Sequence, residues 1–279
     1  MDLAHYSISE LKQLLDSSDE TKKMEILRMA SGDNRIGIRE LVEKHHNKRK
    51  IYEKKIEHLK MMTRHERSLT EKGYNFIAGA DEVGRGCLAG PIVAGAVIMP
   101  KGNTVFDIKD SKILSAKKRE FLAAKIKEIA ISYMVSVVDR SVIDESGIQS
   151  ANIGALKAAS LGLQPLPDFI LIDGFVIKGI GIPHAKVIKG DLNSQSIAAA
   201  SIIAKVYRDE MMRNMDEKYP IYGFKKNKGY GTADHIKAIE THGPCEQHRR
   251  TFSPVSDYYG EGAPLGYKPE GSPDERERI

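Results

Sequence analysis

The chain has 279 residues, of which 41% are hydrophobic and 29% are charged, so its composition is that of a folded domain and excludes a disordered chain. At about 150 residues per domain, this length predicts two domains, or one domain with an extension. The net charge of +5 is compatible with binding to nucleic acid. Only two cysteines occur, Cys87 and Cys245, which excludes a disulfide scaffold and a cysteine-based zinc site. With no apolar run of about 18 residues and no secretory signal pattern, we expect a cytoplasmic protein.

Residues 1–71 are predicted to form a basic helical extension. Ser7 opens a helical stretch that continues to Met29, and apolar residues at helical spacing predict one long helix from Ile38 to Lys72. Within that helix, residues 44–67 carry nine Lys or Arg and three acids, an excess larger than the net charge of the whole chain. This charge fits a solvated helix face and contact with nucleic-acid phosphates equally well.

From Gly73 onward, short apolar runs alternate with helical patterns. The predicted strands cover residues 74–81, 92–99, 131–138, 169–174 and 185–188. The predicted helices follow Ser115, begin near Ile143, follow Ser194 and follow Thr232. The alternation predicts an α/β domain with a mixed sheet over residues 72–258. Residues 259–279 are rich in Gly, Pro and charge, and they are predicted to be a disordered tail.

Acidic residues follow three of the predicted strands. Asp81 and Glu82 end the first strand, Asp173 ends an apolar strand, and Asp191 follows a short one. Because ligands gather at the carboxyl ends of strands in open α/β sheets, these four carboxylates are expected to meet. They would repel one another unless cations balanced them, and hard oxygen ligands favour Mg²⁺ or Mn²⁺. Two such ions activate water and stabilise the leaving oxygen when a phosphodiester is cleaved. Each acid alone is better explained as a helix cap or a partner of a lysine.

A glycine-rich turn follows the acid pair. Gly79 and Gly84 have the spacing of a phosphate-binding loop, but Arg85 and Gly86 stand where that motif needs Lys and Ser or Thr. The dinucleotide-binding pattern also fails, because no glycine follows Gly86 after three residues. What remains is a backbone that a ligand can approach closely, with the fork of Arg85 available for phosphate. A simple tight turn would explain the glycines but not the acids beside them.

These motifs together resemble those of bacterial ribonuclease HII. The run Asp81-Glu82-Val83-Gly84-Arg85-Gly86 is similar to the opening motif of that family. Further similar blocks follow in the family's order at residues 110–115, 171–174, 189–209, 222–232 and 248–252, so the resemblance spans about 73–255. The sequence departs from the family at Cys87, where proline is commonest, and at Ile113, where a second lysine is common.

The resemblance implies a ribonuclease H-like fold, with a mixed central sheet flanked by helices, a C-terminal helical segment and the N-terminal helical extension. It also implies an endonuclease that hydrolyses the RNA strand of RNA–DNA hybrids and cuts on the 5′ side of single ribonucleotides in duplex DNA. The reaction would use two metal ions, Mg²⁺ or Mn²⁺, and leave 3′-hydroxyl and 5′-phosphate ends. A role in ribonucleotide excision repair would follow.

The resemblance also assigns roles to individual residues. The catalytic and metal-binding carboxylates would be Asp81, Glu82, Asp173 and Asp191. The residues that bind substrate would be Gly84, Arg85, Gly86, Lys112 and Tyr230. The first three would sense the ribose 2′-hydroxyl through the minor groove, where that group lies. Lys112 would lie near a phosphate, and Tyr230 would stack on the neighbouring deoxyribose. From the residues alone Tyr230 is more readily a packing residue, although the nearby lysines favour a nucleic-acid role.

Two alternatives stay open. Ribonuclease HIII also has four metal-binding acids and an extension, but its extension is a mixed α/β platform and it prefers longer RNA stretches. A non-catalytic hybrid-binding protein is disfavoured, because a binder has no reason to gather acids at a phosphate site. No long coiled-coil seam is evident, so a monomer is expected. We also expect the extension to aid duplex binding through Lys48, Arg49, Lys50, Lys54 and Lys55.

Overall fold

The computed structural model describes residues 5–102, 105, 108 and 114–259. Apart from Tyr259, the tail that was predicted to be disordered lies outside these residues. The chain divides into two compact units, Met1–Leu59 and Lys60–Ile279. The domain limits predicted from the sequence stay predictions, although helix α4 (Arg64–Glu71) packs within the second unit, where Leu69 is buried against Ile77 and Leu171.

The first unit is built of helices joined by short connections, and its described residues contain no strand. It contains α1 (Ile8–Ser17), α2 (Glu20–Ala30) and all but the last three residues of α3 (Ile36–Met62). The single helical stretch predicted from Ser7 is two helices, because α1 ends at Ser17 and Asp19 starts α2 as its N-cap. The Asp19 carboxylate accepts the Lys22 N–H at 2.8 Å. Eight apolar side chains form the core of this unit: Leu11, Leu15, Ile26, Leu27, Ala30, Ile38, Leu41 and Val42.

The long helix predicted up to Lys72 is also two helices. Helix α3 ends at Met62, Thr63 leaves the helical conformation with φ −98° and ψ 7°, and α4 begins at Arg64. The periodicity of apolar residues continues across Thr63, so it did not reveal the break. Helix α4 is instead fixed by its carboxylate Glu66, which accepts hydrogen bonds from the Ser194 hydroxyl and the Ser196 N–H.

The second unit is built on a mixed sheet of five strands in the order β3-β2-β1-β4-β5. The strands are β1 (Ile77–Val83), β2 (Ile92–Ile98), β3 (Ser132–Val138), β4 (Phe169–Asp173) and β5 (His184–Val187). Strands β1, β2 and β3 are antiparallel neighbours, whereas β4 runs parallel to both β1 and β5. All five strands predicted from the sequence are confirmed, with ends that differ by at most three residues.

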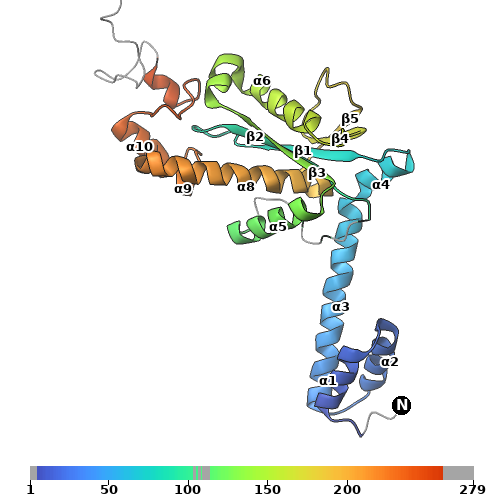
Figure 1. Cartoon of the computed structure of the whole chain (residues 1–279). Coiled ribbons are helices and arrows are strands. Elements are labelled where there is room, and N and C mark those ends of the chain that lie inside the picture. Colours follow the sequence, from blue (N-terminus) through green and yellow to red (C-terminus); the bar gives the residue numbers. More distant parts are fainter. Residues whose placement is uncertain (1–4, 103–104, 106–107, 109–113, 260–279) are drawn as a thin grey trace, which may run out of the picture. The chain divides into compact units, whose positions relative to one another are not determined.

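Helices cover both faces of the sheet, with α6 on one face and α5 and α8 on the other (Figure 1). The helices and short turns are α5 (Ala116–Ile129), α6 (Arg140–Leu161), α7 (Gly190–Asn193), α8 (Gln195–Lys218), η1 (Pro220–Tyr222), α9 (Phe224–Asn227), α10 (Ala233–His242) and η2 (Val255–Tyr258). The predicted caps are confirmed, because the hydroxyls of Ser115, Ser194 and Thr232 each accept an N–H from the first turn of their helix. The α/β class and mixed sheet are therefore as expected.

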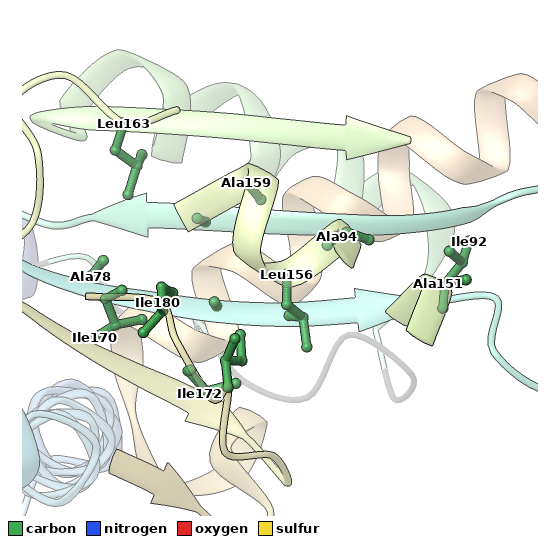
Figure 2. Packing of buried hydrophobic residues seen from close by; sticks show 14 of the residues in the cluster. Ala78, Ile92, Ala94, Ala151, Leu156, Ala159, Leu163, Ile170, Ile172 and Ile180 are labelled. Carbon is green, nitrogen blue, oxygen red and sulfur yellow. The ribbon is translucent and has the colours of Figure 1, made fainter. Parts of the chain in front are cut away.

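The two faces of the sheet carry separate apolar cores. Figure 2 shows Ala78 and Ala94 of the sheet facing Ala151, Leu156 and Ala159 of α6. On the opposite face α8 lies in direct backbone contact with β1 and β2. A Cβ at Gly79 would lie 2.1 Å from the carbonyl carbon of Ser196, and one at Gly95 would lie 2.5 Å from the carbonyl oxygen of Ala200. This close approach fixes the position of α8 against the two strands that lead to the predicted site.

Candidate active site

The register of the sheet brings two predicted acids side by side. Ala80 of β1 pairs with Ile172 of the parallel strand β4, so the next residues, Asp81 and Asp173, stand at neighbouring positions at the carboxyl ends of their strands. Glu82 follows on β1, and its N–H donates to the Asp81 carboxylate at 2.8 Å. Three of the four predicted carboxylates are therefore gathered where ligands bind in α/β sheets.

Asp191 lies in α7, the short helix after β5, and only 6% of it is exposed. Its neighbour Gly190 donates its N–H to the Asp173 carboxylate at 2.7 Å. A Cβ at Gly190 would lie 3.1 Å from the same carboxylate oxygen, so glycine allows this approach. The contact ties the segment that carries Asp191 to the end of β4. The Lys189 backbone before it is left-handed, with φ 52°, which turns the chain from β5 into α7.

The electrostatics of the acids are unfavourable when no cation balances them. Burial raises the pKa of Asp81 well above its ordinary value of 3.8, and the charges of Glu82 and Asp173 raise it further. Burial, with the charge of Asp173, also raises the pKa of Glu82 from 4.5 to about 7, although Arg85 opposes this. Pairs of buried acids that push each other's pKa upward are typical of functional sites.

The donor set fits a hard divalent cation. The Oε2 atom of Glu82 is buried and has no hydrogen-bond partner, so it is available to a ligand of positive charge. Carboxylate oxygens are the ligands that Mg²⁺ and Mn²⁺ prefer. Across the described residues, no group of three or more His, Cys, Asp or Glu already stands in an arrangement that could hold a metal ion. The metal-binding role of the four acids therefore stays a prediction.

The glycine-rich loop, residues 84–91, leaves the end of β1 directly after the acids. Gly84 has a φ of +93°, and a Cβ there would lie 2.2 Å from Nε of the buried Arg208, so only glycine fits. The exposed Arg85 is held from two sides. Its Nη2 donates to Gln149 of α6 at 2.9 Å, and its guanidinium lies 5.0 Å from the centre of the Phe175 ring. Gly86 is exposed, and a Cβ there would meet open space.

Tyr230 lies between α9 and α10, with 41% of it exposed. The Nζ of Lys205 is 5.9 Å from the centre of its ring. The preceding residue ties this segment to the glycine-rich loop, because the Gly229 carbonyl accepts the Leu88 N–H at 2.8 Å. The structure thus brings the predicted stacking residue beside the predicted ribose-sensing loop. Lys112 lies outside the described residues.

A buried histidine pair holds the backbone of Tyr230. His235 Nδ1 lies 2.9 Å from the Tyr230 carbonyl, and its Nε2 lies 3.0 Å from Nε2 of His248. At the other end, the Cys245 N–H donates to Nδ1 of His248 at 3.0 Å. The partners at the two ends of the pair set the tautomers. Nδ1 of His235 donates to the Tyr230 carbonyl and Nδ1 of His248 accepts the Cys245 N–H, so Nε2 of His248 donates to Nε2 of His235 and both rings are neutral. Burial accordingly lowers the pKa of His248 to about 3.

Sequence reasoning did not find several residues around the site. Ser201 of α8 hydrogen-bonds the Asp81 carboxylate, and the fully buried Asn152 of α6 lies beside Glu82 and lowers its pKa. Two buried arginines, Arg208 and Arg249, hold the glycine-rich loop from beneath. Asn152 is one of many polar residues in α6, so nothing in the local sequence marked it or its partner.

Two protein-family models match the chain. The model of the family Ribonuclease HII matches residues 78–255, and the model of the Ribonuclease HII N-terminal domain matches residues 7–70. The chain belongs to the ribonuclease HII family. Ribonuclease HII of Bacillus anthracis is 44% identical over 253 residues, which cover 90% of this chain and 97% of that protein. Ribonuclease HII of Oceanobacillus iheyensis is 41% identical over 252 residues, which cover 90% of this chain and 96% of that protein.

Solved structures agree with this membership. The ribonuclease H2 of Pyrococcus horikoshii is 27% identical with a TM-score of 0.57, and the match covers 65% of this chain and 95% of that one. Bst-RNase HIII in complex with Mn²⁺ is 20% identical with a TM-score of 0.51, and the match covers 67% of this chain and 70% of that one. This similarity shows the shared ribonuclease H-like fold. This ribonuclease HII chain is thus a hydrolase of the ribonuclease H class, from a metal-dependent family that cleaves the RNA of RNA–DNA hybrids.

In the described part of this ribonuclease HII, no helix combines the length and the apolar character that crossing a membrane requires.

Proposed function

We propose that this ribonuclease HII cuts RNA–DNA hybrids and also cuts on the 5′ side of single ribonucleotides in duplex DNA, leaving 3′-hydroxyl and 5′-phosphate ends. The observation that carries the proposal is that Asp81 and Asp173 stand at neighbouring positions of β1 and β4, and that the glycine-rich loop follows β1. Acids that would hold cations and a backbone that can approach a ribose are thereby brought side by side.

Asp81, Glu82, Asp173 and Asp191 would hold two divalent ions, Mg²⁺ or Mn²⁺. When bound, such ions activate a water molecule and stabilise the leaving oxygen of the phosphodiester. The chain's own contribution is to hold the carboxylates ready. Ser201 and the Glu82 N–H orient Asp81, and the Gly190 N–H orients Asp173. The rise in the pKa of Glu82 to about 7 supports the proposal, because a cation would relieve the repulsion that causes it.

The substrate would lie along the glycine-rich loop. Gly84, Arg85 and Gly86 would sense the ribose 2′-hydroxyl in the minor groove and the phosphates beside it. Tyr230 would stack on the neighbouring deoxyribose, and its exposed ring beside the Lys205 ammonium supports contact with nucleic acid. Lys112 would lie near a substrate phosphate.

The ribonuclease HIII-like alternative is less well supported. Residues 7–70 match the N-terminal domain of ribonuclease HII, and the described part of the extension is helical instead of a mixed α/β platform. The extension would add contacts to duplex phosphates through the basic residues of α3, whose Lys48, Lys50 and Lys54 are exposed.

The test is cleavage of a labelled DNA duplex that carries one ribonucleotide, with Mg²⁺, with Mn²⁺ and with EDTA. We expect metal-dependent cutting on the 5′ side of the ribonucleotide, and a loss of at least about a hundredfold in Asp81→Asn. Asp257→Asn, the same change at an exposed position of η2, is the matched control. If a long hybrid is cut but this duplex is not, the ribonuclease HIII-like reading replaces the proposal. If the duplex is bound and never cut, the proposal fails.

A further inference from the structure

Two arginines are buried beneath the glycine-rich loop. Arg208 of α8 and Arg249, which follows the His248 segment, are each 0% exposed. Burying a guanidinium is costly unless its donors are satisfied. Within the described residues, neither arginine forms an ion pair with a carboxylate. Two positive charges are therefore held inside the protein by neutral partners, so those partners must satisfy the guanidinium donors.

Those neutral partners are backbone carbonyls of the loop. Arg249 donates to Gly84 at 2.7 Å, to Arg85 at 2.9 Å, and to Gly90 at 2.9 and 3.0 Å. It therefore joins the start of the loop to its end. The Phe252 ring, 5.1 Å from the guanidinium carbon, offsets part of the cost of burying the charge. Only a guanidinium has a rigid fork with enough donors to bridge three carbonyls.

Arg208 joins the loop to the segment that carries Tyr230. It donates to the carbonyls of Ala89 at 3.1 Å and Pro91 at 2.9 Å, and to that of Lys228 at 2.8 Å. Its side chain also occupies the space where a Cβ of Gly84 would lie. The two arginines thus fix the loop and place it against its neighbour.

The direction of the carbonyls decides where the loop's donors point. In a planar trans peptide, the carbonyl of one residue and the N–H of the next point in opposite directions. Because the carbonyls of Gly84 and Arg85 point down to Arg249, the N–H groups of Arg85 and Gly86 point away from it. No described residue accepts a hydrogen bond from either N–H, and both residues are exposed. Two adjacent free N–H groups above two positive charges suit a hydroxyl oxygen or a phosphate.

From this geometry we infer that Arg249, supported by Arg208, is a positioning residue for ribose recognition: it holds the peptides after Gly84 and Arg85 so that two N–H groups face the substrate. The inference rests on the proposed function, in which this loop reads the 2′-hydroxyl. Burial lowers the pKa of Arg249 only to about 10, so the group keeps its charge near neutral pH.

The experiment measures specificity, because a merely structural role would weaken all substrates together. Affinity in EDTA is measured by fluorescence anisotropy for a duplex with one ribonucleotide and for the identical all-DNA duplex. Arg249→Lys keeps the charge and loses the fork. We expect the ratio of the two affinities to fall about tenfold toward one, with binding of the all-DNA duplex little changed. Arg250→Lys, the same change at the exposed neighbour, is expected to keep the ratio.

Each outcome decides the inference. A ratio that Arg249→Lys leaves unchanged, or a ratio near one in the unsubstituted protein, overturns it. Cleavage at the ribonucleotide by the unsubstituted protein is scored in parallel, so that failure of the proposed function is seen separately. If circular dichroism shows that Arg249→Lys is unfolded, the amide resonances of Arg85 and Gly86 in the unsubstituted protein decide. We expect the ribonucleotide duplex to shift them more than the all-DNA duplex does, and equal shifts refute the inference.

Discussion

The unfavourable electrostatics at Glu82 predict that removing its charge stabilises the metal-free protein. Its pKa is about 7 in the folded state against an ordinary value of 4.5. Between these values the folded state binds more protons than the unfolded state, so stability falls as pH rises through this window. Since a tenfold change in proton affinity is worth about 1.4 kcal/mol, the full cost is about 3 kcal/mol once both states are ionised.

Glu82→Gln keeps the shape of the side chain and removes the charge. We expect the free energy of unfolding in EDTA to rise by about 3 kcal/mol at pH 8 and to change little at pH 4, where the carboxyl is protonated in both states. The measurement is urea unfolding followed by circular dichroism at both pH values. Excess Mg²⁺ is expected to shrink the gain at pH 8, because a bound cation stabilises the charged form of the unsubstituted protein.

The matched control is Glu128→Gln, the same change at an exposed position of α5. It is expected to alter the free energy of unfolding by less than about 0.5 kcal/mol at either pH. A gain in Glu82→Gln that is equal at pH 4 and pH 8 would show that packing, not charge, is responsible. No gain at pH 8 would show that the carboxylate is better solvated than its burial indicates.

Three further predictions follow from packing, charge and stacking. Gly79→Ala should lower the unfolding free energy by more than about 3 kcal/mol, because its Cβ would overlap the Ser196 backbone, whereas Gly154→Ala, with open space, should not; equal thermal shifts would contradict this. Tyr230→Ala should lower kcat/KM on a single-ribonucleotide duplex at least about tenfold and Tyr230→Phe much less, and equal losses would exclude stacking. Replacing basic α3 residues by Gln should weaken duplex binding more at low than at high salt, and an unchanged salt slope would refute a phosphate contact. The residues to replace are Lys48, Arg49, Lys50, Lys54 and Lys55.

The sequence predicted the strands of the second unit well, because most of them are short apolar runs between turn residues. It also predicted the helix caps, which depend only on a hydroxyl and the first turn that follows it. It failed at the helical extension, where apolar periodicity continues through Thr63 and past Asp19 although the helices end there. Local pattern therefore identified which residues are helical, but not where one helix stops and another begins.

The candidate site was predictable only as a set of residues. That acids end three strands is visible in the sequence, but the adjacency of Asp81 and Asp173 depends on the parallel register of β1 and β4. The roles of Arg208 and Arg249 were out of reach for the same reason. Their partners are backbone carbonyls between 20 and 165 residues away, and no side-chain pattern marks a carbonyl.

Asp81 and Glu82 precede the glycine-rich loop that the two buried arginines hold, but the acids and the arginines have opposite effects on stability. Glu82, near the end of β1, is buried at an electrostatic cost, so its neutral replacement should stabilise the metal-free fold. Arg249 satisfies three carbonyls of the next eight residues, and its loss would leave those of Arg85 and Gly90 unpaired, at about 1–3 kcal/mol each, whereas the Gly84 carbonyl would keep the Cys87 N–H. A rigid loop next to destabilised carboxylates is what a site needs if a cation and a sugar are to be recognised together. Under the proposed function, the repulsion between the acids would be relieved by a bound cation, and the fixed peptides would meet the ribose without rearranging.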